Sequence, residues 1–153
     1  MPELFLAGEA ETEEFGLRIG HSMVASSILL LDGELGVGKT TMARGVARGL
    51  GVEEPVTSPT FLTLKVYQTR LGVVLLHVDL YRVDGGDYLE EQGILEAVDE
   101  GAIAAVEWGE KAAGLERYDP LEVRIREDGD GRRVSWNASP EWKERLERGG
   151  LEF

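Results

Sequence analysis

The chain has 153 residues, of which 42% are hydrophobic and 29% are charged, as in an ordinary soluble globular domain with its own core. Its net charge of -13 excludes a protein that holds phosphate backbones by itself, so we expect any nucleic acid to be held by a partner. The absence of cysteine excludes disulfides, thiolate metal sites and a cysteine nucleophile, and two histidines argue against a histidine-rich zinc site.

No apolar run approaches the roughly 18 residues of a membrane span, and the acidic start lacks the basic segment of a secretory signal. We therefore expect a cytoplasmic protein without a membrane partner. The chain shows no internal repeat and no low-complexity linker, which predicts a single domain over residues 1–153.

The first half of the chain alternates between strand and helix patterns. A short strand is predicted over 3–7, followed by a helix over 12–21 that Thr12 caps. The continuous apolar run over 27–32 is typical of a strand buried on both faces. A helix over 39–48 follows a glycine-rich loop.

The next segments predict a hairpin and then a return to buried structure. The apolar runs over 61–69 and 73–81 flank a short turn, which is typical of two antiparallel strands. Residues 86–101 predict one or two short helices broken at Gly93, and 102–108 predict another buried strand.

The last third predicts a second hairpin and a final helix. Apolar and polar residues alternate on both sides of the turn at 128–131. The helix over 139–150 has strong start signals, with Ser139 as N-cap and Pro140 in the first turn. Together these elements predict an α/β fold whose mixed parallel and antiparallel sheet is flanked by helices.

The glycine-rich loop "GELGVGKT" over 33–40 fits the pattern G-x-x-x-x-G-K-[ST]. Glycines let successive backbone N–H groups approach phosphates, and the following helix adds its positive dipole end. Lys39 can reach the β- and γ-phosphates, and the Thr40 hydroxyl can ligate Mg²⁺. The loop therefore predicts a nucleoside triphosphate site.

Two carboxylates could complete this site. Asp79 and Glu107 each end an apolar strand, and strand ends gather at the ligand crevice of an open α/β sheet. One could hold the metal through water while the other orients or deprotonates the attacking water. The residues alone leave open which acid has which role, and each could also be a surface acid that closes a strand.

Other features have mainly structural interpretations. His77 lies inside an apolar strand and is predicted to be a core histidine rather than a base. Trp136 and Trp142 are predicted to be core residues. The segment 56–64 contains Thr60, which reads either as part of a turn into a strand or as a switch that senses the γ-phosphate.

The segments "GELGVGKTT", "SPTF", "HVDLYRV" and "VEWGE", in this order, resemble the TsaE (YjeE) family of small bacterial P-loop ATPases of tRNA threonylcarbamoyladenosine (t6A) synthesis. The resemblance spans about residues 8–110. It implies a P-loop NTPase fold, ATP and Mg²⁺ as cofactors, and ATP hydrolysis that is weak alone and stimulated by TsaD and TsaB. It also implies that tRNA is reached only through that complex.

The resemblance also implies the site residues. Its catalytic positions are Lys39, Asp79, Glu107 and Thr60, and its metal positions are Thr40 and Glu107. Its loop contacts to the nucleotide are Gly33, Glu34, Leu35, Gly36, Val37, Gly38, Lys39, Thr40 and Thr41. Three further positions match residues near the nucleotide: Thr12 near the base, Trp108 beside the nucleotide, and Arg133 near the C-terminus.

Three other functions are alternatives to an ATPase. A small P-loop kinase would transfer the γ-phosphate to a metabolite, but it usually needs an arginine-bearing lid, and residues 82–101 carry one basic residue among many acids. A GTPase switch would normally need an Asn-Lys-x-Asp element, whereas the only asparagine, Asn137, precedes Ala138. A nucleotide-binding module with negligible hydrolysis is the third.

Overall fold

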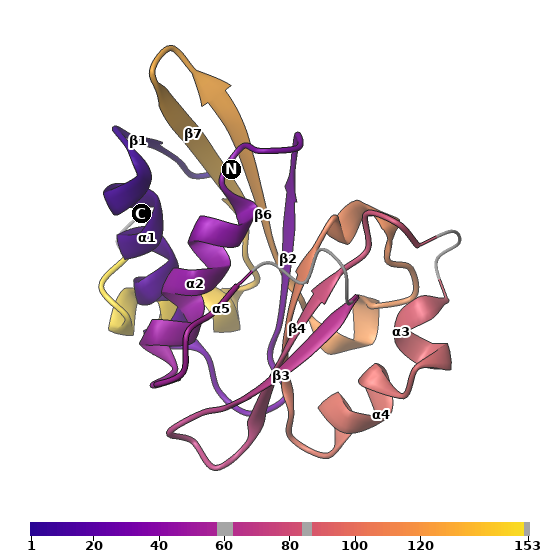
Figure 1. Ribbon diagram of the computed structural model, residues 1–153. Coiled ribbons are helices and arrows are strands. Elements are labelled where there is room, and N and C mark those ends of the chain that lie inside the picture. Colours follow the sequence, from indigo (N-terminus) through magenta and orange to yellow (C-terminus); the bar gives the residue numbers. More distant parts are fainter. Residues whose placement is uncertain (58–62, 84–86, 152–153) are drawn as a thin grey trace.

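The computed structural model describes residues 1–57, 63–83 and 87–151. Its centre is a seven-stranded sheet with the order β1-β7-β6-β2-β5-β4-β3. Helices α1, α2 and α5 cover one face of this sheet, and α3 and α4 cover the other (Figure 1). The predicted α/β fold with helices on both faces is therefore confirmed.

The strands are β1 (Glu3–Leu6), β2 (Ile28–Gly33), β3 (Leu64–Gln68), β4 (Val74–Asp79), β5 (Ile103–Glu107), β6 (Leu121–Asp128) and β7 (Gly131–Asn137). The helices are α1 (Glu9–Ser22), α2 (Lys39–Gly49), α3 (Tyr88–Glu91), α4 (Ile94–Asp99) and α5 (Pro140–Arg148). Two 3₁₀ turns, Gly109–Lys111 and Glu116–Tyr118, connect β5 to β6.

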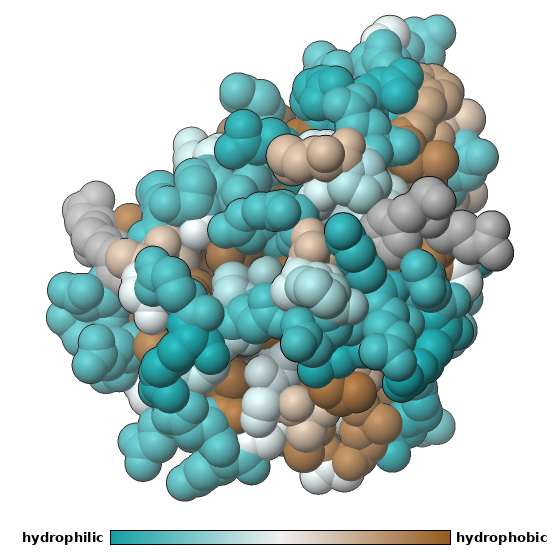
Figure 2. Space-filling model, turned by 180° about the vertical axis from the view of Figure 1, so that it is seen from behind, coloured by the Kyte–Doolittle hydropathy of each residue, from teal (hydrophilic) through white to brown (hydrophobic). Residues whose placement is uncertain are grey.

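The sheet is mixed, as the two hairpins predicted. Strands β6, β2, β5 and β4 form a parallel centre, which β7 and β3 join antiparallel. Strand β1 pairs antiparallel with β7 at the edge of the sheet. The central strands β2 and β5 are almost wholly buried because helices cover both faces of the sheet. Seen from behind, the surface is mostly hydrophilic with separate smaller hydrophobic areas (Figure 2). In the described part of the chain, no helix is both long enough and apolar enough to span a membrane.

One helix boundary was predicted wrongly. Helix α1 begins at Glu9 with Gly8 as its N-cap, so Thr12 lies inside the first turn instead of capping it. The Thr12 hydroxyl donates to the Gly8 carbonyl at 3.2 Å, which uses the side chain within the helix. The predicted start of α5 is confirmed, because Ser139 is its N-cap and the Ser139 hydroxyl accepts from the backbone N–H of Trp142 at 3.2 Å. The predicted strand over 61–69 begins at Leu64 among the described residues.

Helices α1 and α2 pack through glycines. A Cβ atom on Gly16 would lie 2.1 Å from the Met42 carbonyl oxygen, and one on Gly45 would lie 2.0 Å from the Glu13 carbonyl oxygen. Gly20 and Gly49 repeat this contact one turn further along. The two helix backbones therefore touch, which no larger residue would permit.

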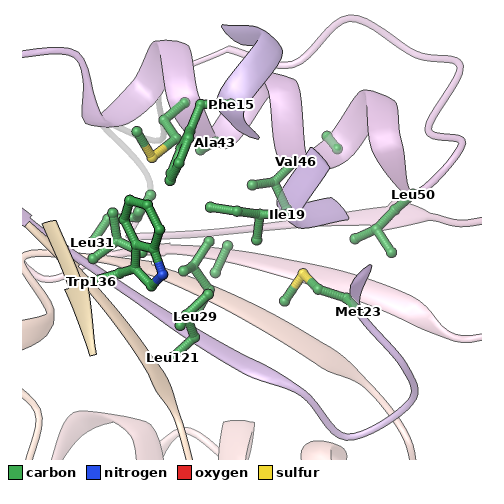
Figure 3. Packing of buried hydrophobic residues seen from close by; sticks show 14 of the residues in the cluster. Phe15, Ile19, Met23, Leu29, Leu31, Ala43, Val46, Leu50, Leu121 and Trp136 are labelled. Carbon is green, nitrogen blue, oxygen red and sulfur yellow. The ribbon is translucent and has the colours of Figure 1, made fainter. Parts of the chain in front are cut away.

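The paired helices present one apolar surface to the sheet (Figure 3). The Phe15 and Trp136 rings lie 5.3 Å apart between centroids, which joins α1 to β7. Trp136 and Trp142 are both buried, as predicted. The other labelled members of this cluster are Ile19, Met23, Leu29, Leu31, Ala43, Val46, Leu50 and Leu121.

The turn after β5 leaves the sheet through a left-handed residue, Trp108, with φ 61°. The backbone N–H of Glu110 donates to Asp32 Oδ1 at 2.8 Å, which fastens this turn to the end of β2. Burial, reinforced by the neighbouring Glu110 carboxyl, raises the pKa of Asp32 to about 7. The turn is therefore held by a carboxyl group whose proton dissociates only near pH 7.

We predict that Gly45→Ala destabilises the protein. Alanine favours helices over glycine by about 1 kcal/mol, but its methyl group would overlap the α1 backbone. Relief of that overlap requires the helices to separate, so we expect the free energy of unfolding to fall by about 2 kcal/mol. Urea denaturation measures this change. Gly8→Ser is the control, because no atom lies within 4 Å of the added Cβ, and an unchanged Gly45→Ala midpoint would contradict the prediction.

We predict that Asp32→Asn stabilises the protein at alkaline pH. Because folding raises this pKa from 3.8 to about 7, the folded state binds more protons than the unfolded state between these values, and the wild type loses stability as the pH rises through them. Asparagine keeps the oxygen that accepts from Glu110 but cannot ionise.

The variant should exceed the wild type in free energy of unfolding by about 1 kcal/mol at about pH 8, after allowance for solvent screening of the partly exposed carboxyl. The difference should shrink towards about pH 5. Chemical denaturation at both pH values tests this, and a difference that is equal at both would count against it.

Candidate functional site

The glycine-rich loop connects β2 to α2 along the carboxyl edge of the sheet. Gly36 and Gly38 have φ of 77° and 124°, a backbone conformation that other residues rarely adopt. Among the described residues, no side chain caps the N-terminus of α2. The first N–H groups of this helix are therefore available for an anion, as a phosphate site requires.

Lys39 is folded back into its own loop. Its ammonium group donates to the carbonyl oxygens of Gly33 and, at 3.0 Å, Glu34, and lies 3.7 Å from the centre of the Trp108 ring. The side chain is buried. Burial lowers the pKa of Lys39, and the nearby Glu107 carboxylate opposes that effect. The lysine is thus held beside the backbone of the glycine-rich loop.

Strand register brings the two predicted acids together. Asp79 and Glu107 end neighbouring parallel strands and are paired in register. The Thr40 hydroxyl donates to the Glu107 carboxylate, at 3.0 Å from Oε1 and 3.2 Å from Oε2. Asp79 Oδ1 accepts from the backbone N–H of Tyr81 at 2.9 Å. Burial is the main cause that raises the pKa of Asp79.

The Thr40 hydroxyl and the Glu107 carboxylate fit a magnesium ion. Both supply the oxygen ligands that Mg²⁺ prefers, and Mg²⁺ usually takes few protein ligands and fills its shell with phosphates and water. No group of three or more His, Cys, Asp or Glu side chains suited to a metal occurs in the described part of the chain.

Cavities flank the loop on both sides. The one on the carboxylate side has a volume of about 390 Å³ and is lined by Leu35, Gly36, Gly38, Lys39, Thr40, Thr41, Asp79, Tyr81, Arg82, Glu107 and Trp108. The other, of about 250 Å³, is lined by Gly8, Glu9, Thr12, Gly36, Val37, Gly38, Thr41, Asp130, Gly131 and Arg132. Because the cavities share the loop, an elongated ligand lying across it would enter both.

The structure brings most of the predicted site residues together. Lys39, Thr40, Asp79, Glu107 and Trp108 line one cavity, and Thr12 lines the other. Thr60 lies outside the described residues.

The arginine beside the loop is Arg132, not the predicted Arg133. Arg132 Nε donates to the Val37 carbonyl at 2.7 Å, whereas Arg133 Nε pairs with Asp128 Oδ2 at 2.8 Å. Alternation along β7 is the reason, since Arg132 shares its face with the buried Trp136, under α1, and Arg133 faces the opposite way. The sequence contains this signal, because alternation back from Trp136, predicted to be a core residue, puts Arg132 on the same face of the strand.

Sequence reasoning also missed the contact of His77. The ring is buried, as predicted, but its Nε2 lies 2.6 Å from Glu107 Oε2. The pairing of β4 with β5 produces this contact, and sequence spacing alone does not reveal the register of two separate strands.

The family model and the similar proteins all point to the same family. Residues 6–134 match the family model described as "Threonylcarbamoyl adenosine biosynthesis protein TsaE". A Nostoc protein named tRNA threonylcarbamoyladenosine biosynthesis protein TsaE is 39% identical over 116 residues, covering 72% of this chain and 70% of its own. A Streptomyces coelicolor protein of the same name is 42% identical over 114 residues, covering 73% of this chain and 76% of its own.

A solved structure agrees with the fold. The crystal structure of Bacillus subtilis YdiB superposes with a TM-score of 0.75 at 25% sequence identity, covering 97% of this chain and 93% of that one. The matched region contains the loop, both acids and Arg132, so the family match and the site geometry concern the same part of the molecule. The chain belongs to the TsaE family of threonylcarbamoyl adenosine biosynthesis proteins, with the P-loop α/β architecture that its sequence motifs predicted.

Proposed function

We propose that residues 1–153 form one cytoplasmic P-loop ATPase domain that binds ATP with Mg²⁺, hydrolyses it weakly alone, and supports t6A synthesis together with TsaD and TsaB. The observation that carries this proposal is the contact of the Thr40 hydroxyl with the buried Glu107 carboxylate at the start of α2. This contact supports the proposal because a hydroxyl and a carboxylate are oxygen groups of the kind that bind Mg²⁺, and the loop beside them has the pattern that binds phosphates.

The loop and Lys39 would hold the phosphates. Backbone N–H groups of the loop and of the α2 N-terminus would bind the phosphate oxygens, while Lys39 would leave the Gly33 and Glu34 carbonyls and turn to the β- and γ-phosphates. Thr40 and Glu107 would hold Mg²⁺, which when bound neutralises charge that develops on the phosphates.

Asp79 is the residue that we assign to the attacking water. It ends the strand next to Glu107 and lines the same cavity as Lys39. Its raised pKa makes the carboxylate a better proton acceptor than an exposed aspartate, and the hydrogen bond that it accepts from the Tyr81 backbone N–H fixes its orientation. Glu107 is engaged by Thr40, so the two acids have separate roles in this proposal.

The cavity on the far side of the loop would receive the nucleoside. Thr12 and Arg132 line it, and Trp108 lies above Lys39 on the phosphate side. The net charge of -13 supports an indirect relation to tRNA, since an acidic protein is repelled by the phosphate backbone but can bind a complex that holds it.

We predict that ATP hydrolysis by the isolated protein is slow and rises when TsaD and TsaB are added. Lys39→Ala should remove the ammonium contact to the β- and γ-phosphates, and Glu107→Gln should remove the anionic metal ligand. Each should reduce the stimulated rate at least about 100-fold, because electrostatic groups at the transferring phosphate contribute on this order. Release of inorganic phosphate measures the rate.

Lys143→Ala and Glu122→Gln are matched controls, since both residues are exposed and lie outside the site. A rate of ATP hydrolysis that does not change when TsaD and TsaB are added would contradict the proposal that these partners stimulate the enzyme. Transfer of the γ-phosphate to a metabolite instead of to water would favour the small P-loop kinase, which the same assay detects when metabolite pools are screened for phosphorylation.

We predict that Arg132→Ala weakens ATP binding about tenfold and Arg133→Ala changes it less than about twofold. Arg132 contacts the loop carbonyl of Val37, and a charged hydrogen bond of this kind contributes more than 1 kcal/mol. Arg133 makes a partly exposed ion pair with Asp128 instead. Calorimetric titration of both variants with ATP decides between them, and the reverse order of affinities would restore Arg133 as the site residue.

A further inference from the structure

His77 makes a polar contact that the proposed mechanism does not yet use. It lies in the middle of β4, and Glu107 is the last residue of β5, the neighbouring parallel strand. Their side chains are 2% and 4% exposed, and His77 Nε2 lies 2.6 Å from Glu107 Oε2. A short hydrogen bond between two buried side chains on rigid strands fixes both of them strongly.

The donors around Glu107 are distributed unevenly between its two oxygens. His77 contacts Oε2, whereas the Thr40 hydroxyl is nearer to Oε1, at 3.0 Å. With its proton on Nε2 the imidazole donates to Oε2 and keeps Nδ1 as an acceptor, for which the described residues provide no hydrogen-bond partner. Thr40 also lies 3.2 Å from Oε2, so Oε2 is held from the sheet by His77 and approached from the loop by Thr40, whereas Oε1 is turned towards Thr40.

We propose that His77 is a positioning residue for the metal ligand Glu107. By holding Oε2 it directs Oε1 towards Thr40, the side on which Mg²⁺ would be bound with ATP. This inference rests on the proposed function and deepens it. Histidine would not touch the nucleotide or the metal, so its effect would pass through the carboxylate alone.

The strength of this effect follows from the surroundings of Glu107. A buried carboxylate without a fixed partner would turn towards the nearest positive charge, and the Lys39 ammonium interacts electrostatically with it. His77 holds the carboxylate on the sheet side against that attraction. Groups that orient a metal ligand in this way typically change metal affinity 10- to 100-fold when they are removed.

The test compares three substitutions of His77. Gln places an amide N–H at about the reach of Nε2, Asn has a similar amide that is too short, and Leu fills the space with no donor. The readout is the affinity for Mn²⁺ of the complex with a non-hydrolysable ATP analogue, followed by electron paramagnetic resonance. Affinity for the analogue in EDTA, without metal, is measured beside it, and thermal unfolding reports the fold of each variant.

We expect His77→Leu and His77→Asn to lower the Mn²⁺ affinity at least about tenfold while metal-free binding of the analogue changes less than about threefold, because the loop is untouched. His77→Gln should recover the wild-type affinity within about threefold. If Leu does not fold, the Asn and Gln pair carries the same comparison.

Wild-type Mn²⁺ affinity in the Leu or Asn variant would overturn the positioning role while leaving the proposed function intact. Equal weakening in all three variants, Gln included, would reduce His77 to a packing residue and also overturn it. Failure of the wild type itself to bind Mn²⁺ with the analogue would instead overturn the proposed function, so the two failures are distinguishable.

Discussion

The register of the parallel strands is the constraint on which the site depends. Leu31 of β2 and Asp79 of β4 both pair with Glu107 of β5, so β4 and β5 end at one level and β2 continues from there to Gly33, where the loop begins. A shift of one residue would turn Glu107 to the opposite face and separate it from Thr40 and His77. The burial of β2 and β5 on both faces favours this register, because a slip would disrupt the close packing of their side chains against the helices on both faces of the sheet.

The glycine contacts between α1 and α2 are the second constraint on the site, because they fix the position of the start of α2 relative to α1. Because the helix backbones touch at Gly16 and Gly45, the start of α2 lies beside the first turn of α1. Thr12 is consequently adjacent to the loop, with its methyl carbon 3.6 Å from where a Cβ of Gly38 would lie. The helix pair thus sets the width of the cavity on the side away from the acids.

Much of this arrangement could be predicted from the sequence because its signals are local. The loop, the strand before it and the helix after it occur within one continuous segment, and Ser139 with Pro140 marks the start of α5 directly. The sequence placed Asp79 and Glu107 at strand ends but could not show that they are neighbours in register. That relation depends on how separate strands pair.

The errors have different physical origins. Thr12 carries the residue type of an N-cap, yet its hydroxyl bonds to Gly8 within the helix, and tertiary packing places the helix start earlier. Arg132 and Arg133 are chemically equivalent in the sequence, and only the alternation of β7 tells which one faces the loop. The role of Asp32 was invisible because its partner Glu110 is 78 residues away along the chain.

Electrostatics explains why the proposed ligand would need its metal. The protein is strongly acidic, and Glu107, Glu110, Asp79 and Asp32 all interact with the single lysine of the loop. A triphosphate entering this region would meet negative carboxylates on one side, where Arg82 also lines the cavity, and backbone N–H groups, Lys39 and Arg132 on the other. A divalent cation between Glu107 and the phosphates would turn that repulsion into attraction. The acids that make the site unfavourable for a bare triphosphate would therefore make it selective for the magnesium complex.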